Sequence, residues 1–128
     1  MIYLDTSVAL AQLLAEDRLP PERLWRESLV SSRLFEYEIW TRIHGRRLSK
    51  SHGDFVRAIV GRLALLELTT QILARALEPF PAPVRMLDAL HLASLDFLRA
   101  NGQVVELATY DARLARAARA MKIALYRL

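Results

Sequence analysis

Short apolar segments alternate along this chain with longer segments whose apolar residues recur at helical spacing. The strand-like segments are residues 2–4, 29–31, 64–68, 104–108 and 123–126. The helical patterns cover residues 7–15, a short stretch beginning at Pro20-Pro21, and residues 33–48, 51–63, 70–77, 88–100 and 112–121. Strands that alternate with helices favour a parallel sheet, because each helix returns the chain to the edge where the next strand begins. We therefore predict an α/β fold with a twisted parallel sheet of about four to five strands, flanked by helices.

The pattern over residues 33–48 predicts which side of that helix is buried. Leu34, Tyr37, Trp40 and Ile43 follow one another at three-residue spacing. Residues with this spacing are neighbours on a helix surface, so we expect all four to face the core. Trp40, like Trp25, is expected to anchor the core or an interface, with stacking on a nucleic-acid base as the alternative.

Composition limits the class of protein. With 128 residues and 53% apolar side chains the chain can bury one substantial core, so we predict a single domain over residues 1–128. The longest apolar stretches, such as residues 8–14, are shorter than the roughly 20 residues that cross a bilayer, and no basic and apolar leader precedes Asp5. We expect no membrane association and a cytoplasmic location. The absence of cysteine excludes thiolate chemistry and leaves oxygen or imidazole ligands, which favours Mg²⁺ or Mn²⁺.

Four carboxylates stand where this fold would bring them to one edge of the sheet. Asp5 directly follows the first strand, and Asp111 lies just beyond the strand at 104–108. Asp88 begins the helix at 88–100, and Glu38 lies early in the helix at 33–48. Ligand sites of open parallel sheets lie at the carboxyl ends of the strands. Because crowded carboxylates repel one another and raise each other's pKa, such a cluster normally needs a cation, and we predict a divalent metal site.

Each carboxylate also has a structural explanation. Asp88 and Asp111 stand immediately before helical runs, where aspartate commonly caps the helix. Glu38 could pair with Arg42 one turn further along, in a surface bridge of small energy. Asp5 is harder to explain in this way, because aspartate is disfavoured in strands and the next two residues carry hydroxyl groups that could cap the helix instead.

Charge indicates a polyanionic partner. The chain has 18 basic and 14 acidic residues, so if four carboxylates occupy one pocket, 18 basic residues face only ten acidic ones elsewhere. A basic body around an acidic pocket suits a nucleic-acid backbone delivered to a metal, and the guanidinium fork of arginine suits phosphate oxygens. The candidate phosphate-positioning residues are Arg42, Arg46, Arg47 and Arg85. The alternative is that these arginines only solvate exposed helices.

One histidine lies near a predicted site residue. His91 follows Asp88 by three residues and therefore shares its helix face, but its neighbours are apolar. We expect it to be a hydrogen-bonded interior residue rather than a metal ligand. Asp96, further along the same helix, is expected to pair with Arg99 or Arg57.

Four motifs, in order along nearly the whole chain, resemble those of the PIN-domain ribonucleases, in particular the VapC-type toxins of toxin–antitoxin pairs. They are Tyr3-Leu-Asp-Thr-Ser, Ser32 with Glu38 six positions later, Val84-Arg-Met-Leu-Asp-Ala-Leu-His-Leu-Ala, and Thr109-Tyr-Asp-Ala-Arg-Leu-Ala-Arg-Ala-Ala. Residues 45–83 match only in length and helical character. The resemblance implies a PIN-like fold over residues 1–128.

The resemblance also implies a chemistry for these residues. It makes Asp5, Glu38, Asp88 and Asp111 the catalytic and metal-binding acids, with Ser7 and Thr109 as supporting hydroxyl positions. Asp5 and Asp88 would be the main ligands of Mg²⁺ or Mn²⁺, while Glu38 and Asp111 complete the shell, orient water or accept a proton. The expected reaction is endonucleolytic hydrolysis of RNA, with tRNA or rRNA as substrate.

The implied partners are a VapB-type antitoxin, the RNA substrate and a second copy of the chain. The antitoxin's C-terminal segment would lie across the active-site groove, and exposed helices near residues 25–40 could supply a homodimer surface. Two other classes of protein remain. A non-catalytic PIN-like module for RNA or protein binding is the stronger, although all four acids are present. A phosphotransfer enzyme is the weaker, because Ser7 stands where such enzymes place a second aspartate.

Overall fold

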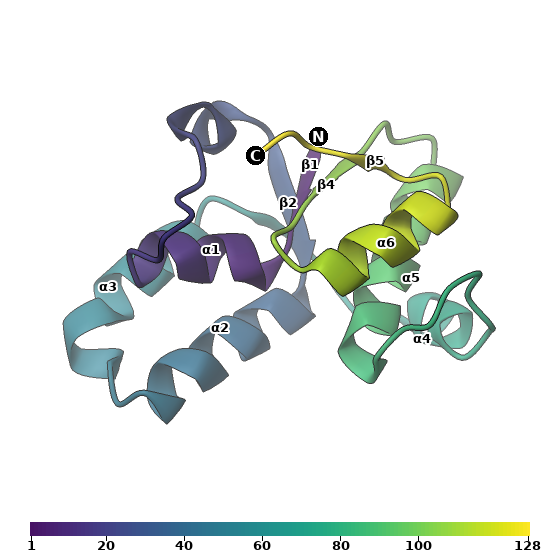
Figure 1. Ribbon diagram of the computed structural model, residues 1–128. Coiled ribbons are helices and arrows are strands. Elements are labelled where there is room, and N and C mark those ends of the chain that lie inside the picture. Colours follow the sequence, from purple (N-terminus) through teal and green to yellow (C-terminus); the bar gives the residue numbers. More distant parts are fainter.

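Five parallel strands form one sheet in the computed structural model, which describes all residues from 1 to 128 (Figure 1). The strands are β1 (Ile2–Leu4), β2 (Leu29–Ser32), β3 (Ala64–Leu66), β4 (Glu106–Ala108) and β5 (Ala124–Leu125). Their order in the sheet is β3-β2-β1-β4-β5, and every neighbouring pair is parallel. The predicted α/β class and parallel sheet are confirmed, and the last three strands are shorter than the predicted segments.

Six α-helices cover the two faces of the sheet. They are α1 (Thr6–Leu13), α2 (Arg33–Gly45), α3 (Ser49–Val60), α4 (Thr70–Ala76), α5 (Met86–Ala100) and α6 (Ala112–Ala120). Helices α1, α2 and α3 lie on one side of the strands and α4, α5 and α6 on the other (Figure 1). The short helix predicted from Pro20-Pro21 is a 3₁₀ turn, η1 (Glu22–Arg26). No helix is long and apolar enough to cross a membrane.

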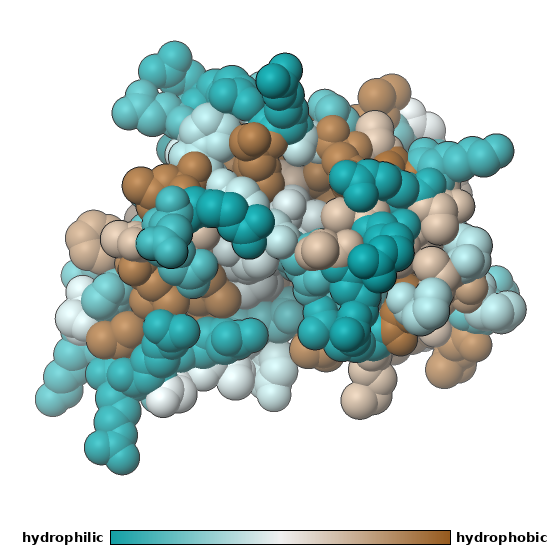
Figure 2. All heavy atoms as spheres, viewed as in Figure 1, coloured by the Kyte–Doolittle hydropathy of each residue, from teal (hydrophilic) through white to brown (hydrophobic).

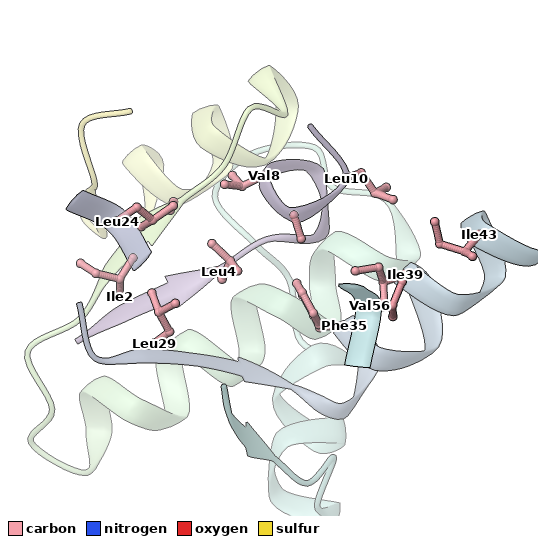
Figure 3. Packing of buried hydrophobic residues seen from close by; sticks show 12 residues of the cluster. Ile2, Leu4, Val8, Leu10, Leu24, Leu29, Phe35, Ile39, Ile43 and Val56 are labelled. Carbon is pink, nitrogen blue, oxygen red and sulfur yellow. The ribbon is translucent and has the colours of Figure 1, made fainter. Parts of the chain in front are cut away.

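Alternating strand residues build a separate core on each face of the sheet. Ile2 and Leu4 of β1 pack with side chains of α1, α2 and α3 (Figure 3), whereas Tyr3 between them packs with side chains of α5 and α6. Leu29 and Val30 of β2 divide between the two cores in the same way. Successive side chains of a strand point to opposite faces, so a strand buried on both sides is apolar at every position.

The buried face of α2 differs from the predicted one. Phe35, Ile39 and Ile43 are fully buried, whereas the side chain of Tyr37 is 66% exposed and Trp40 is only partly buried. Steps of three residues turn backwards by about 60° each, and a run of them leaves the core. Steps of four turn forwards by only about 40°, and this is the spacing that α2 uses. The expectation for Tyr37 was wrong for this reason.

The order of the strands places a crevice beside β1. From β1 the chain moves outward to β2 and β3, then crosses back to β4 and β5 on the other side of β1. In open parallel sheets the ligand site lies at this reversal, beyond the carboxyl ends of the two central strands. Asp5 follows β1 there, and its backbone N–H donates to the carbonyl oxygen of Ala108 at the end of β4, at 3.0 Å. Residues 109–111 directly follow β4 and therefore start at the same edge of the sheet.

The face assignment of α2 can be tested by a pair of substitutions two residues apart. Phe35→Ala empties a fully buried site and should lower the free energy of unfolding by about 3–5 kcal/mol. Tyr37→Ala removes an exposed ring and should change it by less than about 0.5 kcal/mol. Urea denaturation followed by circular dichroism measures both, and equal losses would contradict the burial of α2 described here.

Candidate active site

A cleft of about 540 Å³ is lined by residues at the starts of α1 and α5, on α2 and just before α6. Figure 1 shows where these helices lie. All four predicted acids line it: Asp5 after β1, Glu38 on α2, Asp88 on α5 and Asp111 before α6. The helices and strands that carry these acids are widely separated in sequence. The reversal of strand order brings the four acids to the same end of the sheet. The cleft is also lined by Thr6, Ser7, Leu10, Tyr37, Thr41, Arg42, Arg85, Met86, Leu87 and His91.

Two hydroxyl groups hold the carboxylate of Asp5, which is buried. Oδ2 accepts hydrogen bonds from Ser7 Oγ at 2.6 Å and from Thr109 Oγ1 at 2.7 Å. Backbone N–H groups of Tyr110 and Asp111 donate in turn to these same hydroxyl oxygens. The structure thus places both predicted hydroxyl positions, Ser7 and Thr109, against Asp5 and ties the loop after β4 to the start of α1. Oδ1 of Asp5 accepts no hydrogen bond from the protein.

A buried polar chain holds Glu38. Its Oε1 accepts from Thr6 Oγ1 at 3.1 Å and lies 2.6 Å from His91 Nε2, while His91 Nδ1 lies 2.8 Å from the hydroxyl of Tyr3. His91 and Tyr3 are almost completely buried. The chain therefore joins β1, α5 and α2 across the cleft floor. Glu38 makes no ion pair with Arg42, so that alternative was wrong.

His91 acts here as a hydrogen-bond donor to Glu38. Burial lowers the pKa of His91, whereas Tyr3, the hydrogen bond to Glu38 and the charges of Asp5 and Glu38 raise it, and the net pKa lies well above the usual histidine value. Nε2 carries a hydrogen in the imidazolium, and in the neutral tautomer that accepts from Tyr3 it does so as well. The sequence predicted an interior histidine, which the structure confirms, but not its partners. The one sequence feature that pointed to a place near the site was the spacing of three residues between Asp88 and His91.

Arg85 bridges the other two acids. Its Nε lies 3.1 Å from Asp88 Oδ2 and its Nη2 lies 2.5 Å from Asp111 Oδ2. The hydrogen bond and the charge of Asp88, followed by the charge of Asp111, raise the pKa of Arg85. Asp111 also caps α6, because Oδ1 accepts from the N–H groups of Arg113 and Leu114. The capping expectation is thus met at Asp111.

Asp88 does not stand at the N-cap of its helix. Helix α5 begins at Met86 with Arg85 as N-cap, so the buried Asp88 is the third helical residue. Asp88 Oδ2 accepts from the backbone N–H of Arg85 at 3.4 Å as well as from its side chain. Aspartate in the first turn of a helix interacts favourably with the helix dipole.

A family model described as the PIN domain matches residues 2–120. The chain belongs to the PIN-domain family. It is similar over most of its length to two proteins of Mycobacterium tuberculosis (strain CDC 1551 / Oshkosh). Ribonuclease VapC47 is 30% identical over 121 residues, which cover 89% of this chain and 87% of the relative. Ribonuclease VapC35 is 31% identical over 130 aligned residues, which cover 97% of this chain and 94% of the relative. The VapC-type resemblance read from the four motifs is thereby confirmed.

The donor set of this PIN domain suits a hard divalent cation. Carboxylate oxygens are the ligands that Mg²⁺ and Mn²⁺ prefer. Three of them, Asp5 Oδ1, Glu38 Oε2 and Asp88 Oδ1, accept no hydrogen bond from the protein. As placed, no three Asp, Glu or His side chains gather closely enough to hold one ion. Arg85 supplies a positive charge between Asp88 and Asp111 instead. The chemistry of this donor set fits the metal.

Carboxylates and arginines elsewhere in this PIN domain are placed differently. Asp96 lies on α5 outside the cleft and pairs with Arg99, as expected, and also with Arg75. Arg57 pairs with Asp54 instead. Among the predicted phosphate-positioning residues, Arg42 and Arg85 line the cleft, while Arg46 and Arg47 are exposed at the end of α2 and do not line it.

The Tyr3–His91–Glu38 chain makes a testable contribution to stability. Tyr3→Phe should lower the free energy of unfolding by about 1 kcal/mol. His91→Ala should cost more, about 2–4 kcal/mol, because it removes a partner of both the buried Tyr3 hydroxyl and the partly buried Glu38 carboxylate. The double variant should lose less than the sum of the two by at least about 0.5 kcal/mol, since both act in one network. Urea unfolding of the four proteins measures this, and additive losses would contradict the coupling.

Proposed function

We propose that this chain is a metal-dependent endoribonuclease and the toxin of a VapBC-type toxin–antitoxin pair. The observation that carries the proposal is the convergence of Asp5, Glu38, Asp88 and Asp111 on one cleft at the strand-order reversal. Two relatives that match most of the chain bear the name ribonuclease, which supports the same reaction. The site residues are part of this proposal.

The four acids act as two pairs in the proposed reaction. Asp5 and Asp88 bind Mg²⁺ or Mn²⁺, and Glu38 and Asp111 complete the shell or orient water. When bound, such a metal activates water for attack on a phosphodiester and relieves negative charge in the transition state. The protein fixes the donors beforehand: Ser7 and Thr109 engage one oxygen of Asp5, and His91 engages one oxygen of Glu38, which leaves the second oxygen of each for metal or water.

The substrate we propose is tRNA or rRNA, and the site of action is the cytoplasm, where both are found. The proposed partner is a VapB-type antitoxin that covers the cleft and supplies a cation to its carboxylates, as Arg85 does in this chain. We further propose a homodimer. The rival function, a non-catalytic RNA-binding or protein-interaction module, has no need of four acids gathered on one cleft, two of them buried.

Cleavage of purified total tRNA and rRNA tests the reaction directly. Wild type should give discrete fragments with Mg²⁺ or Mn²⁺ and none with EDTA. Asp5→Asn and Asp88→Asn should each lower the cleavage rate by at least about 100-fold, because each removes a charged ligand. Asp96→Asn is the matched control: it changes a carboxylate on the same helix as Asp88 but outside the cleft, and its rate should stay near wild type.

The outcomes separate the two functions. Absence of cleavage by a folded wild type freed of any antitoxin would favour the binding module. Cleavage that survives in both Asn variants would show that the reaction takes place elsewhere or belongs to a contaminant.

Arg42, Arg46, Arg47 and Arg85 remain the proposed phosphate contacts on the α2 and α5 sides of the cleft. The combined substitutions Arg46→Gln and Arg47→Gln should weaken RNA binding and reduce the slope of log affinity against log salt by up to about 1.4, since each phosphate contact on a single strand contributes about 0.7. Fluorescence anisotropy at several salt concentrations measures the slope. A slope equal to that of wild type would remove these two residues from the binding surface.

A further inference from the structure

A second groove, of about 630 Å³, lies between α6 and the C-terminal segment that contains β5. We call it the α6 groove. Its lining residues include Arg18, Tyr110, Asp111, Arg116, Arg119 and Arg127. Four of these side chains are arginines, and Asp111 is the only carboxylate side chain among them. The groove is therefore strongly basic, in contrast to the acidic cleft beside it.

None of the four groove arginines has an acidic partner. Arg18, Arg116, Arg119 and Arg127 are exposed, and no ion pair of the structure includes any of them. Arg113, next to the groove on the same helix, is likewise exposed and without an acidic partner. The view of Figure 2 shows strongly hydrophilic side chains gathered over α6. Unpaired guanidinium groups gathered on one surface attract a polyanion.

The spacing of the helix arginines suits a chain of phosphates. Arg113, Arg116 and Arg119 follow one another at three-residue intervals, while Leu114, Ala115, Ala117 and Ala118 between them are buried. A helix rises about 1.5 Å per residue, so these three residues extend over about 9 Å along one side of α6. A row of this length can contact more than one phosphate of the same strand.

Two tyrosines that line the groove contact guanidinium groups, that of Arg18 in the groove and that of Arg23 outside its lining. The Arg18 guanidinium lies 4.7 Å from the centroid of the Tyr110 ring, and its Nη2 lies 3.5 Å from the Tyr110 carbonyl oxygen. The Arg23 guanidinium lies 5.7 Å from the centroid of Tyr126, and its Nη2 donates to the Arg127 carbonyl oxygen. Stacking of this kind fixes an arginine that still has N–H groups for an anion, which lowers the entropy lost on binding.

The α6 groove adjoins the acidic cleft. Asp111 lines both, and Thr109, which lines the groove, donates its hydroxyl hydrogen to Asp5 in the cleft. A nucleic-acid strand lying in the groove would therefore lie next to the four carboxylates. Repulsion by those acids opposes entry of a polyanion, so a nearby surface of unpaired cations is needed to hold the strand.

We propose that the α6 groove binds a single-stranded RNA segment next to the cleaved bond, with Arg116 and Arg119 as its main phosphate contacts. The inference rests on the proposed ribonuclease function and assigns it a substrate-binding surface separate from the end of α2. Arg18 and Arg127 contact the same backbone, and Arg113 extends the track along α6. Charge complementarity and the shared wall with the acidic cleft identify the occupant as nucleic acid.

Binding of a fluorescein-labelled single-stranded RNA of about 12 nucleotides tests the proposal. The protein is the full chain carrying Asp5→Asn, so that cleavage does not interfere. Adding Arg116→Gln and Arg119→Gln should weaken binding about tenfold or more at moderate salt and reduce the salt slope by about 1.4. Arg116→Lys with Arg119→Lys keeps the charges and should keep most of the slope.

The matched control removes the same charge elsewhere. Arg26→Gln with Lys50→Gln changes two exposed residues that line neither the cleft nor the α6 groove. This pair should leave the salt slope at the parent value. Thermal unfolding of every variant verifies that surface substitutions on α6 have not altered the fold.

Three results would overturn the proposal. The Gln pair on α6 could show the same slope as the control pair, or the parent could bind no RNA. Poly-glutamate could instead bind through Arg116 and Arg119 while RNA binding stays unchanged, which would assign the groove to an acidic protein segment. Failure of the nuclease function gives a different pattern: RNA binds through α6, but wild type cleaves nothing.

Discussion

The pairing of β1 with β4 is the contact on which the site depends. These strands are separated by about a hundred residues of sequence, yet they lie side by side at the centre of the sheet because the chain crosses back after β3. The crossing places the residue after β1, Asp5, against the loop after β4, and the hydrogen bond from the Asp5 N–H to Ala108 fixes that register. A slip of one residue between these strands would turn Asp5 away from Thr109, since strand side chains alternate between faces.

Each acid of the cleft is held by a hydrogen-bonding or charged partner. Thr109 holds Asp5 across the two central strands, His91 of α5 holds Glu38 of α2, and Arg85 joins Asp88 to Asp111. An ionised carboxylate that is partly withdrawn from water needs such partners, because an unpaired buried charge is costly. The same partners fix where each free oxygen lies. Stability of the cleft and positioning of its ligands therefore come from one set of contacts.

The two signs of charge are segregated on neighbouring surfaces. Carboxylates gather in the cleft, and unpaired arginines gather in the α6 groove, with Asp111 in the wall between them. Attraction to a polyanion is long-ranged and does not depend on detailed fit, whereas metal coordination requires oxygen atoms at defined positions. Separate surfaces allow the same chain to meet both requirements, with the arginines at exposed positions and the acids around the carboxyl ends of the strands.

Local spacing in the sequence was enough to predict the strands, most helices and the edge at which the acids meet. Apolar runs, helical periods and residues that follow a strand are short-range properties, and each depends on only a few neighbouring residues. For that reason the sequence was enough to predict that four acids, Asp5, Glu38, Asp88 and Asp111, meet at one edge of the sheet. The pairing of Glu38 with His91 could not be predicted, because the two are separated by 53 residues. Thr109, which is 104 residues from Asp5, was indicated only by the family resemblance. Which side of α2 is buried, whether Arg85 is bound by acids, and which arginines share a groove depend on how helices pack against the sheet, and only the tertiary structure settles that packing.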